Sequence, residues 1–179
     1  MAARWLDEVE DLARSSLPAA VMRYVAQGAG DEVTTSEAVD AWRALRLAPH
    51  VLRDVSVVAT VTTLLGTEVR MPAAVAPTTL QRAAHPDGEV AMARAVAGAG
   101  SLLVVSSNAG MPFADIAATG VAWWLQAYLP QRRELARPML HAAVAAGARA
   151  VVLTVDTPVV GTKYDDGPGV WESVETGWV

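Results

Sequence analysis

The chain contains no cysteine, and this absence excludes several kinds of chemistry at once. Without thiols it can form no disulfide, can offer no cysteine ligand to a metal ion and has no cysteine nucleophile. The three histidines, His50, His85 and His141, are scattered and lack the spacing of metal ligands. We therefore expect no metal site, and the lack of disulfides fits the cytoplasmic location that we expect.

Basic residues and long apolar runs are also scarce. The chain has 14 lysines and arginines against 19 acidic residues, and no basic stripe, so we expect no binding to nucleic acid. A run such as AVAGAGSLLVV is far shorter than the roughly 20 residues that span a membrane. The start, MAARWLDEVEDLARSSLP, carries acidic residues where a signal peptide has its apolar core. We expect neither membrane insertion nor export.

Small apolar residues dominate what is present. The chain is 53% hydrophobic and 18% charged over 179 residues, which suits one sizeable core of the α/β class. Apolar residues at helical spacing predict a first helix, and Ser16-Leu17-Pro18 predicts the start of a second that runs to Gly28. Thr34 and Glu37 have capping-box spacing and predict a third helix over 38–45. The run VLRDVSVVATVTTLLGTEVRM predicts a hairpin that turns near Gly66.

A repeating unit begins at Met71. Four strand-like runs, PAAVAP, LLVVSS, WWLQAY and AVVLTV, alternate with helical stretches over 88–99, 112–118 and 132–146. This alternation predicts βα units and a parallel sheet, whose near-continuous apolar strands should be buried on both faces. A (β/α)8 barrel takes about 250 residues. We therefore expect an α/β fold equal to the N-terminal half of such a barrel, with residues 1–70 as helices and hairpin, 71–165 as four βα units and 166–179 as an irregular tail.

Polar residues stand where these strands end. Pro77-Thr78-Thr79 follows the first strand, Ser106-Ser107 the second, and Thr154 the fourth, while Gln126 and Tyr128 alternate along the third. Ligands of α/β proteins bind at the carboxyl ends of the strands, so these residues are candidates for a site. A plain structural alternative remains for Ser106 and Thr154, which could be strand-end hydroxyls bonded within the protein.

Six blocks of sequence resemble one enzyme family. They are YVAQGAGDEVT, APHVLRDVS, PAAVAPTTLQRAAHPDGEVAMARA, LLVVSS, WWLQAY and VVLTVDTPVVG. In this order and at this spacing they resemble the FMN-dependent α-hydroxy-acid oxidases and dehydrogenases, which include glycolate oxidase, lactate oxidase and mandelate dehydrogenase. The resemblance runs from about Leu17 to Gly161 and implies a (β/α)8 barrel that holds FMN at the carboxyl ends of its strands.

The resemblance also implies roles for matching residues around the flavin. The backbone of Pro77, Thr78 and Thr79 should face the N5 and O4 edge of the ring. Ser106 and Gln126 should form hydrogen bonds with the isoalloxazine, and Thr154 should contact its pyrimidine side.

Three further residues should meet the substrate, a small 2-hydroxy acid. The resemblance implies that Tyr128 lies between flavin and substrate and that Tyr24 binds the substrate carboxylate. Lys163 stands where the family usually has an arginine, and a lysine supplies charge without the bidentate fork of a guanidinium. The same family comparison favours a structural role for His85.

The implied reaction is the FMN-dependent oxidation of an L-2-hydroxy acid to a 2-oxo acid. The family's later lysine, its histidine base and its carboxylate-binding arginine have no match here, so we predict a truncated chain that is inactive alone and has no catalytic residue of its own. The alternative is a non-catalytic half-barrel that pairs with itself or with a partner through its open sheet edges. A different flavin- or phosphate-binding barrel, such as an isomerase, is a weaker option, against which Tyr24 and Tyr128 speak.

Overall fold

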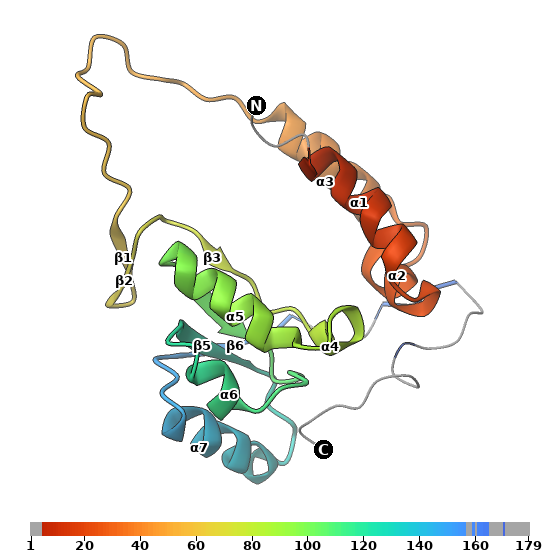
Figure 1. The fold of residues 1–179 in the computed structure, drawn as a ribbon. Helices are drawn as coiled ribbons and strands as arrows, with labels where there is room; N and C mark the ends of the chain where they lie inside the picture. Colours follow the sequence, from red (N-terminus) through yellow and green to blue (C-terminus); the bar gives the residue numbers. More distant parts are fainter. Residues whose placement is uncertain (1–4, 157–158, 160, 165–169, 171–179) are drawn as a thin grey trace. The chain divides into compact units, whose positions relative to one another are not determined.

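The computed structural model describes residues 5–156, 159, 161–164 and 170, and it divides the chain into two units (Figure 1). The N-terminal unit comprises the described residues of 1–58 and 159–173. The sheet unit comprises those of 59–158. The tail predicted over 166–179 lies outside the described residues, apart from the buried Val170 of the N-terminal unit.

Three helices form the N-terminal unit: α1 (Trp5–Ser16), α2 (Ala19–Ala26) and α3 (Val33–Ala44). Helix α2 begins directly after Pro18, as the sequence predicts, because proline fixes a backbone angle that suits a helix start. The capping box predicted at Thr34 is wrong, since α3 already begins at Val33, after Glu32. The carboxylate of Glu32 accepts a hydrogen bond from the Gly28 backbone N–H at 2.8 Å and thereby closes the preceding turn.

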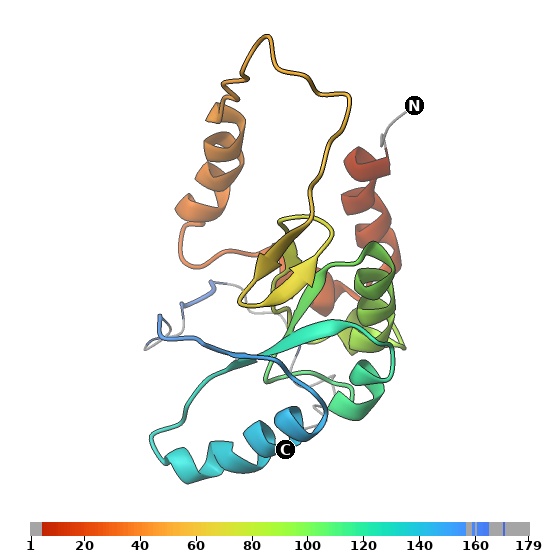
Figure 2. The ribbon, with the colours of Figure 1, turned by 90° about the vertical axis from the view of Figure 1, so that its left-hand side faces the viewer.

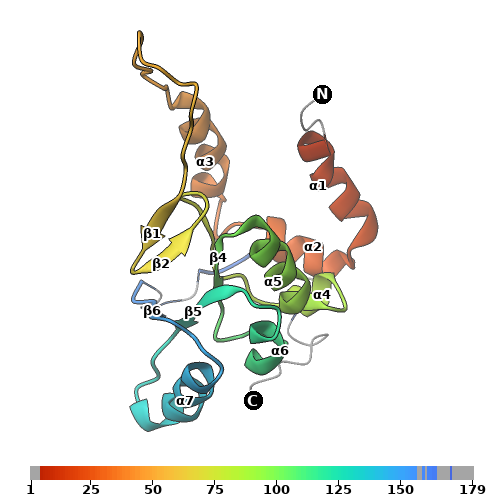
Figure 3. The ribbon, with the colours of Figure 1, turned by 60° about the vertical axis from the view of Figure 1, so that its left-hand side comes forward.

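The sheet unit opens with the predicted hairpin, formed by β1 (Thr62–Leu64) and β2 (Thr67–Val69) (Figure 3). Its two-residue turn has positive φ at both positions, 44° at Leu65 and 77° at Gly66. Two positive φ angles are the signature of the type I′ turn, whose twist matches that of the two strands.

Four parallel strands follow, in the order β3-β4-β5-β6. The strands are β3 (Ala74–Val75), β4 (Leu102–Val105), β5 (Ala122–Ala127) and β6 (Val151–Leu153). The connections contain α4 (Gln81–Ala84), α5 (Gly88–Ala99), α6 (Phe113–Ala117), the 3-10 helix η1 (Arg133–Ala136) and α7 (Arg137–Ala145). Figure 2 shows the same ribbon turned, with the strands running through the sheet unit beside these helices. The predicted sequence of βα units is confirmed.

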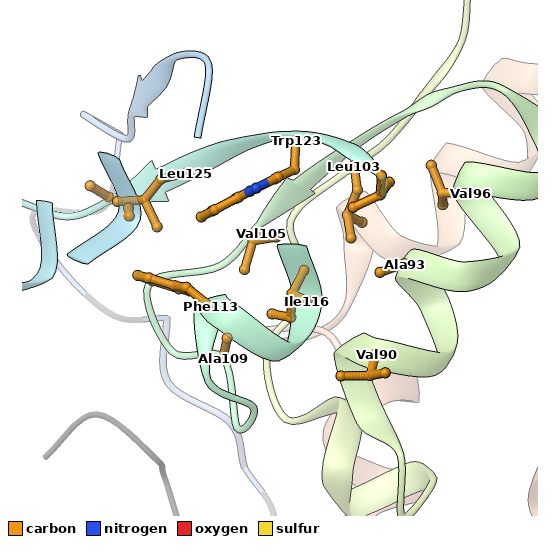
Figure 4. Packing of buried hydrophobic residues seen from close by; sticks show 13 residues of the cluster. Val90, Ala93, Val96, Leu103, Val105, Ala109, Phe113, Ile116, Trp123 and Leu125 are labelled. Carbon is orange, nitrogen blue, oxygen red and sulfur yellow. The ribbon is translucent and has the colours of Figure 1, made fainter. Parts of the chain in front are cut away.

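The core lies between the sheet and its helices (Figure 4). Leu103 and Val105 of β4 and Trp123 and Leu125 of β5 belong to one buried cluster with residues of α5 and α6. The rings of Phe113 and Trp123 lie 5.3 Å apart at 45°, a tilted contact of the kind aromatic pairs favour. Trp123 is therefore a packing residue.

Burial on both faces, predicted for all four strands, holds only in the middle of the sheet. All four residues of β4 are buried. On the outer strand β6, by contrast, Val151 and Leu153 are each 49% exposed. The prediction is wrong for β6 because β5 flanks it on one side only and no described strand pairs with its other edge.

Candidate cofactor site

The polar residues predicted at the strand ends of the sheet unit come together along one edge. Ser106 follows β4, Gln126 lies near the end of β5, and Thr154 follows β6. Because the strands are parallel, their carboxyl ends lie at the same edge of the sheet, and pairing of Gln126 with Val152 brings Thr154 close by. We call Ser106, Ser107, Gln126 and Thr154 the polar edge.

Gln126 is the hub of the polar edge, although its side chain is only 3% exposed. Its Oε1 accepts hydrogen bonds from the Ser107 backbone N–H at 3.2 Å and from the hydroxyls of Ser106 and Ser107, both at 3.4 Å. Its Nε2 donates to Thr154 Oγ1 at 2.8 Å. A buried carboxamide must be paired, and these bonds fix its orientation. Within the described residues they use one of the two Nε2 protons, and the second Nε2 proton can bond to a further acceptor.

The turn after β3 adjoins this edge. Thr79 Oγ1 donates to the backbone carbonyl of Asn108 at 3.3 Å, and the Asn108 N–H donates to Ser106 Oγ at 3.1 Å. Within the described part of the chain, the backbone N–H groups of Thr78 and Thr79 have no acceptor. Pro77 and Thr78 are exposed, so this turn offers free amide donors to a ligand.

Tyr128 lies just beyond the end of β5 and is 46% exposed. It is two residues from Gln126, the hub of the polar edge. Its ring is accessible to a small molecule, whereas the side chain of Gln126 is buried.

Tyr24 and Lys163 belong to the N-terminal unit and contact each other. Lys163 Nζ donates to the backbone carbonyl of Tyr24 at 3.1 Å and lies 4.9 Å from the centre of the Tyr24 ring. The Gly30 N–H also donates to the Thr162 carbonyl at 2.8 Å. The structure therefore brings the two predicted carboxylate-binding residues together, with the lysine ammonium engaged by its neighbour.

Sequence reasoning missed one buried acid, Glu89. It is 1% exposed and accepts a hydrogen bond from the Gly110 N–H at 3.1 Å, in the loop that carries Ser106. Its place in the first turn of α5 is one that an exposed, helix-stabilising carboxylate commonly takes, so the sequence carried no signal of its burial.

Two negative findings apply to the described residues. They contain no cluster of three or more acidic or histidine side chains able to hold a metal ion. None of their helices is long and apolar enough to cross a membrane.

Comparisons with known proteins define the class. A family model described as FMN-dependent dehydrogenase matches residues 13–169. The chain is 39% identical over 160 residues to glycolate oxidase 1 of Zea mays, and this alignment covers 89% of this chain and 43% of that protein. It is 37% identical over 162 residues to glycolate oxidase of Spinacia oleracea, and this alignment covers 90% of this chain and 44% of that protein.

The solved structures agree. A mandelate oxidase with benzoyl-formic acid superposes with a TM-score of 0.83 at 33% identity, over 88% of this chain and 47% of that one. The four parallel strands thus match part of the TIM-barrel oxidase fold. The chain belongs to the FMN-dependent α-hydroxy-acid dehydrogenase family, the family of the glycolate and mandelate oxidases, and spans less than half the length of these relatives.

The residues present fit the cofactor that the family uses. The oxidised isoalloxazine ring carries two carbonyl oxygens, one ring N–H and two unprotonated nitrogens, so it needs both donors and acceptors. Among the residues that the structure describes, the turn after β3 has two amide donors without acceptors, and Gln126 Nε2 has one proton without an acceptor. The Thr154 hydroxyl accepts from Gln126 and can still donate its own proton.

Proposed function

We propose that this chain holds the ring of FMN in an enzyme that oxidises an L-2-hydroxy acid to a 2-oxo acid. The observation that carries this proposal is the polar edge, where the ends of β4, β5 and β6 present a buried, oriented set of donors and acceptors. Membership in the FMN-dependent family supports it. The glycolate and mandelate oxidases it resembles act, by their names, on 2-hydroxy acids.

In this proposal the residues at each strand end contact a different part of the flavin ring. The amides of Thr78 and Thr79, after Pro77, meet the N5 and O4 edge of the flavin. Ser106 and Gln126 bind the ring, and Thr154 binds its pyrimidine side. Gln126 is suited to this role because its four hydrogen bonds leave it a single orientation.

Three residues are proposed to meet the substrate. Tyr128 would direct its hydroxyl toward the substrate oxygens, and Tyr24 and Lys163 would bind the substrate carboxylate. The Lys163 contact with the Tyr24 ring supports a joint role, since it holds a cation beside the phenol.

Bound FMN would accept the hydride from C2 of the hydroxy acid, while a base takes the hydroxyl proton. His50, His85 and His141 are all exposed, and no polar-edge residue forms a hydrogen bond with them. Losing a general base costs about 10²–10⁴-fold in rate. We therefore expect the 179-residue polypeptide to bind FMN yet to give little turnover alone.

Titration of the purified chain with FMN, followed by flavin fluorescence and absorbance, tests the proposal. We expect saturable binding that quenches the fluorescence and structures the flavin absorption band. The variant Gln126→Leu should abolish this change, whereas the exposed Gln131→Leu should not. Absence of FMN binding by the wild-type chain would overturn the proposal, and oxidation of glycolate, lactate or mandelate would overturn the expected inactivity.

A second candidate is a non-catalytic half-barrel that pairs through its sheet edges. The outer position of β6 favours it, because no described strand pairs with its far edge and an unpaired strand edge is a template for another chain. Size-exclusion chromatography with light scattering decides: a monomer at all concentrations argues against self-pairing.

A further inference from the structure

Glu89 is a buried carboxylate that the proposed chemistry does not use. Its side chain is 1% exposed, and its Oε2 is inaccessible and has no hydrogen-bond partner among the described residues. Burying a carboxylate is costly unless it is paired, and the positive end of the α5 dipole compensates only in part. A side chain buried at this cost calls for a specific reason.

The partner of Glu89 suggests that reason. Its Oε1 accepts the hydrogen bond of the Gly110 backbone N–H at 3.1 Å, which ties the start of α5 to the loop between β4 and α6. The other end of this loop carries Ser106 and Ser107, which donate to Gln126. The loop is therefore held at two points, by the polar edge at one end and by Glu89 at the other.

The stem of Arg82 packs the same loop against α4. A Cβ atom at Gly110 would lie 3.0 Å from Arg82 Cδ, and one at Gly88 would lie 2.7 Å from Arg82 Cγ. A side chain at Gly88 would clash with Arg82, and one at Gly110 would press against the same stem, so α4, the start of α5 and the loop pack closely together. Helix α4 itself follows the turn of Thr78 and Thr79.

We propose that Glu89 is a positioning residue of the cofactor site: by holding Gly110, it places the loop of Ser106 beside the turn of Thr78 and Thr79. The Thr79 hydroxyl bond to the Asn108 carbonyl closes this arrangement from the other side. What matters in this role is the reach of the side-chain oxygen to Gly110 rather than its charge. The inference rests on the proposed function, since it treats Ser106 as a flavin contact.

Two substitutions separate reach from charge. Glu89→Gln keeps an oxygen at the same distance and removes the charge, whereas Glu89→Asp keeps the charge and withdraws the oxygen by one methylene. We expect E89Q to bind FMN within about threefold of wild type, and E89D to bind about 10- to 100-fold more weakly, the range for losing a hydrogen bond to a charged group. Asp115→Asn, an exposed acid in the first turn of α6, is the matched control and should change nothing.

Amide hydrogen exchange gives a readout without FMN. The Gly110 amide should exchange about 10- to 100-fold faster in E89D than in wild type, and near the wild-type rate in E89Q. The opposite pattern, with E89D like wild type and E89Q impaired, would show a role for charge and overturn the proposal, as would wild-type exchange in both. If E89D does not fold, Glu89→Ala, which has no side-chain oxygen, takes its place: faster Gly110 exchange in E89A with wild-type exchange in E89Q supports the proposal, and wild-type exchange in both overturns it. If the wild-type chain binds no FMN, the proposed function fails. The exchange rate of the Gly110 amide then still tests whether the Glu89 side chain holds the loop.

Discussion

Gln126 is the residue on which the polar edge depends. Replacing it by leucine keeps the volume but removes the acceptor of three hydrogen bonds and the donor to Thr154. Buried partners left without a bond cost about 1–3 kcal/mol. We expect Gln126→Leu to lower the free energy of unfolding by this amount in urea denaturation.

The control for this prediction is Gln131→Leu, an exposed position, which should change stability by less than about 0.5 kcal/mol. Equal stability of Q126L and wild type would mean that the network does not exist in solution.

The Asp54 carboxyl, in the described stretch between α3 and β1, has a lowered pKa. The Ser56 backbone N–H donates to its carboxylate at 2.8 Å, and this bond, followed by one from the Ser56 side chain, holds the pKa of Asp54 below its usual value of 3.8. The pKa is lower in the folded state, so the turn is favoured above the unfolded pKa and loses this support as the pH falls through the folded value. Ser56→Pro removes both donors and should raise the pKa of Asp54, as measured by NMR titration; an unchanged pKa would contradict this cause.

The hairpin turn is the element whose backbone conflicts most plainly with its sequence. Leu65 has φ 44°, a left-handed conformation that costs a residue with a side chain about 1–2 kcal/mol, while Gly66 at φ 77° adopts it freely. We expect Leu65→Asn to stabilise the protein by about 0.5–1 kcal/mol and Gly66→Ala to destabilise it by about 1 kcal/mol.

These two changes act through the backbone alone. Leu65 is 82% exposed, and a Cβ at Gly66 would meet no atom within 4 Å. Thermal unfolding measures both, and a destabilising effect of L65N would rule out the type I′ turn.

Elements were predictable where the local pattern and the final packing agree. Helix α5 runs from Gly88 to Ala99, as predicted, because Pro86 and Asp87 precede it and Gly100 ends it with φ 66°. Helix α3 was placed too late, because the side chain of Glu32 bonds to Gly28 instead of the predicted cap at Thr34. Several residue pairs could cap this turn, and the spacing could not choose among them.

Over the whole molecule, the exposed outer strand is the feature with measurable consequences. Edge strands promote association unless charged residues or a covering element block them. We expect the chain to self-associate with rising concentration and the double variant Val151→Lys/Leu153→Lys to associate less, as measured by light scattering.

The matched control places the same two charges elsewhere in the sheet unit. Leu135 and Val144 are also exposed, at 58% and 66%, but lie on η1 and α7. If Leu135→Lys/Val144→Lys lowers association equally, added charge rather than the strand edge is responsible.

The sequence alone determined the order of the βα units, the family and most of the polar edge. This was possible because hydrophobic periodicity is local, and because strand ends of a parallel sheet share one edge whatever the details of packing. Ser106, Gln126 and Thr154 were predictable for that reason, and the structure joins them by hydrogen bonds.

Only the tertiary structure decided which side chains are buried and what they touch. Glu89 reads as a surface acid in the sequence, yet packing of α4, α5 and the Ser106 loop encloses it and directs it to Gly110. Lys163 lies far along the chain from Tyr24, and only the folded unit places its ammonium against that residue. Burial and long-range pairing depend on which elements pack together, and no local pattern records that.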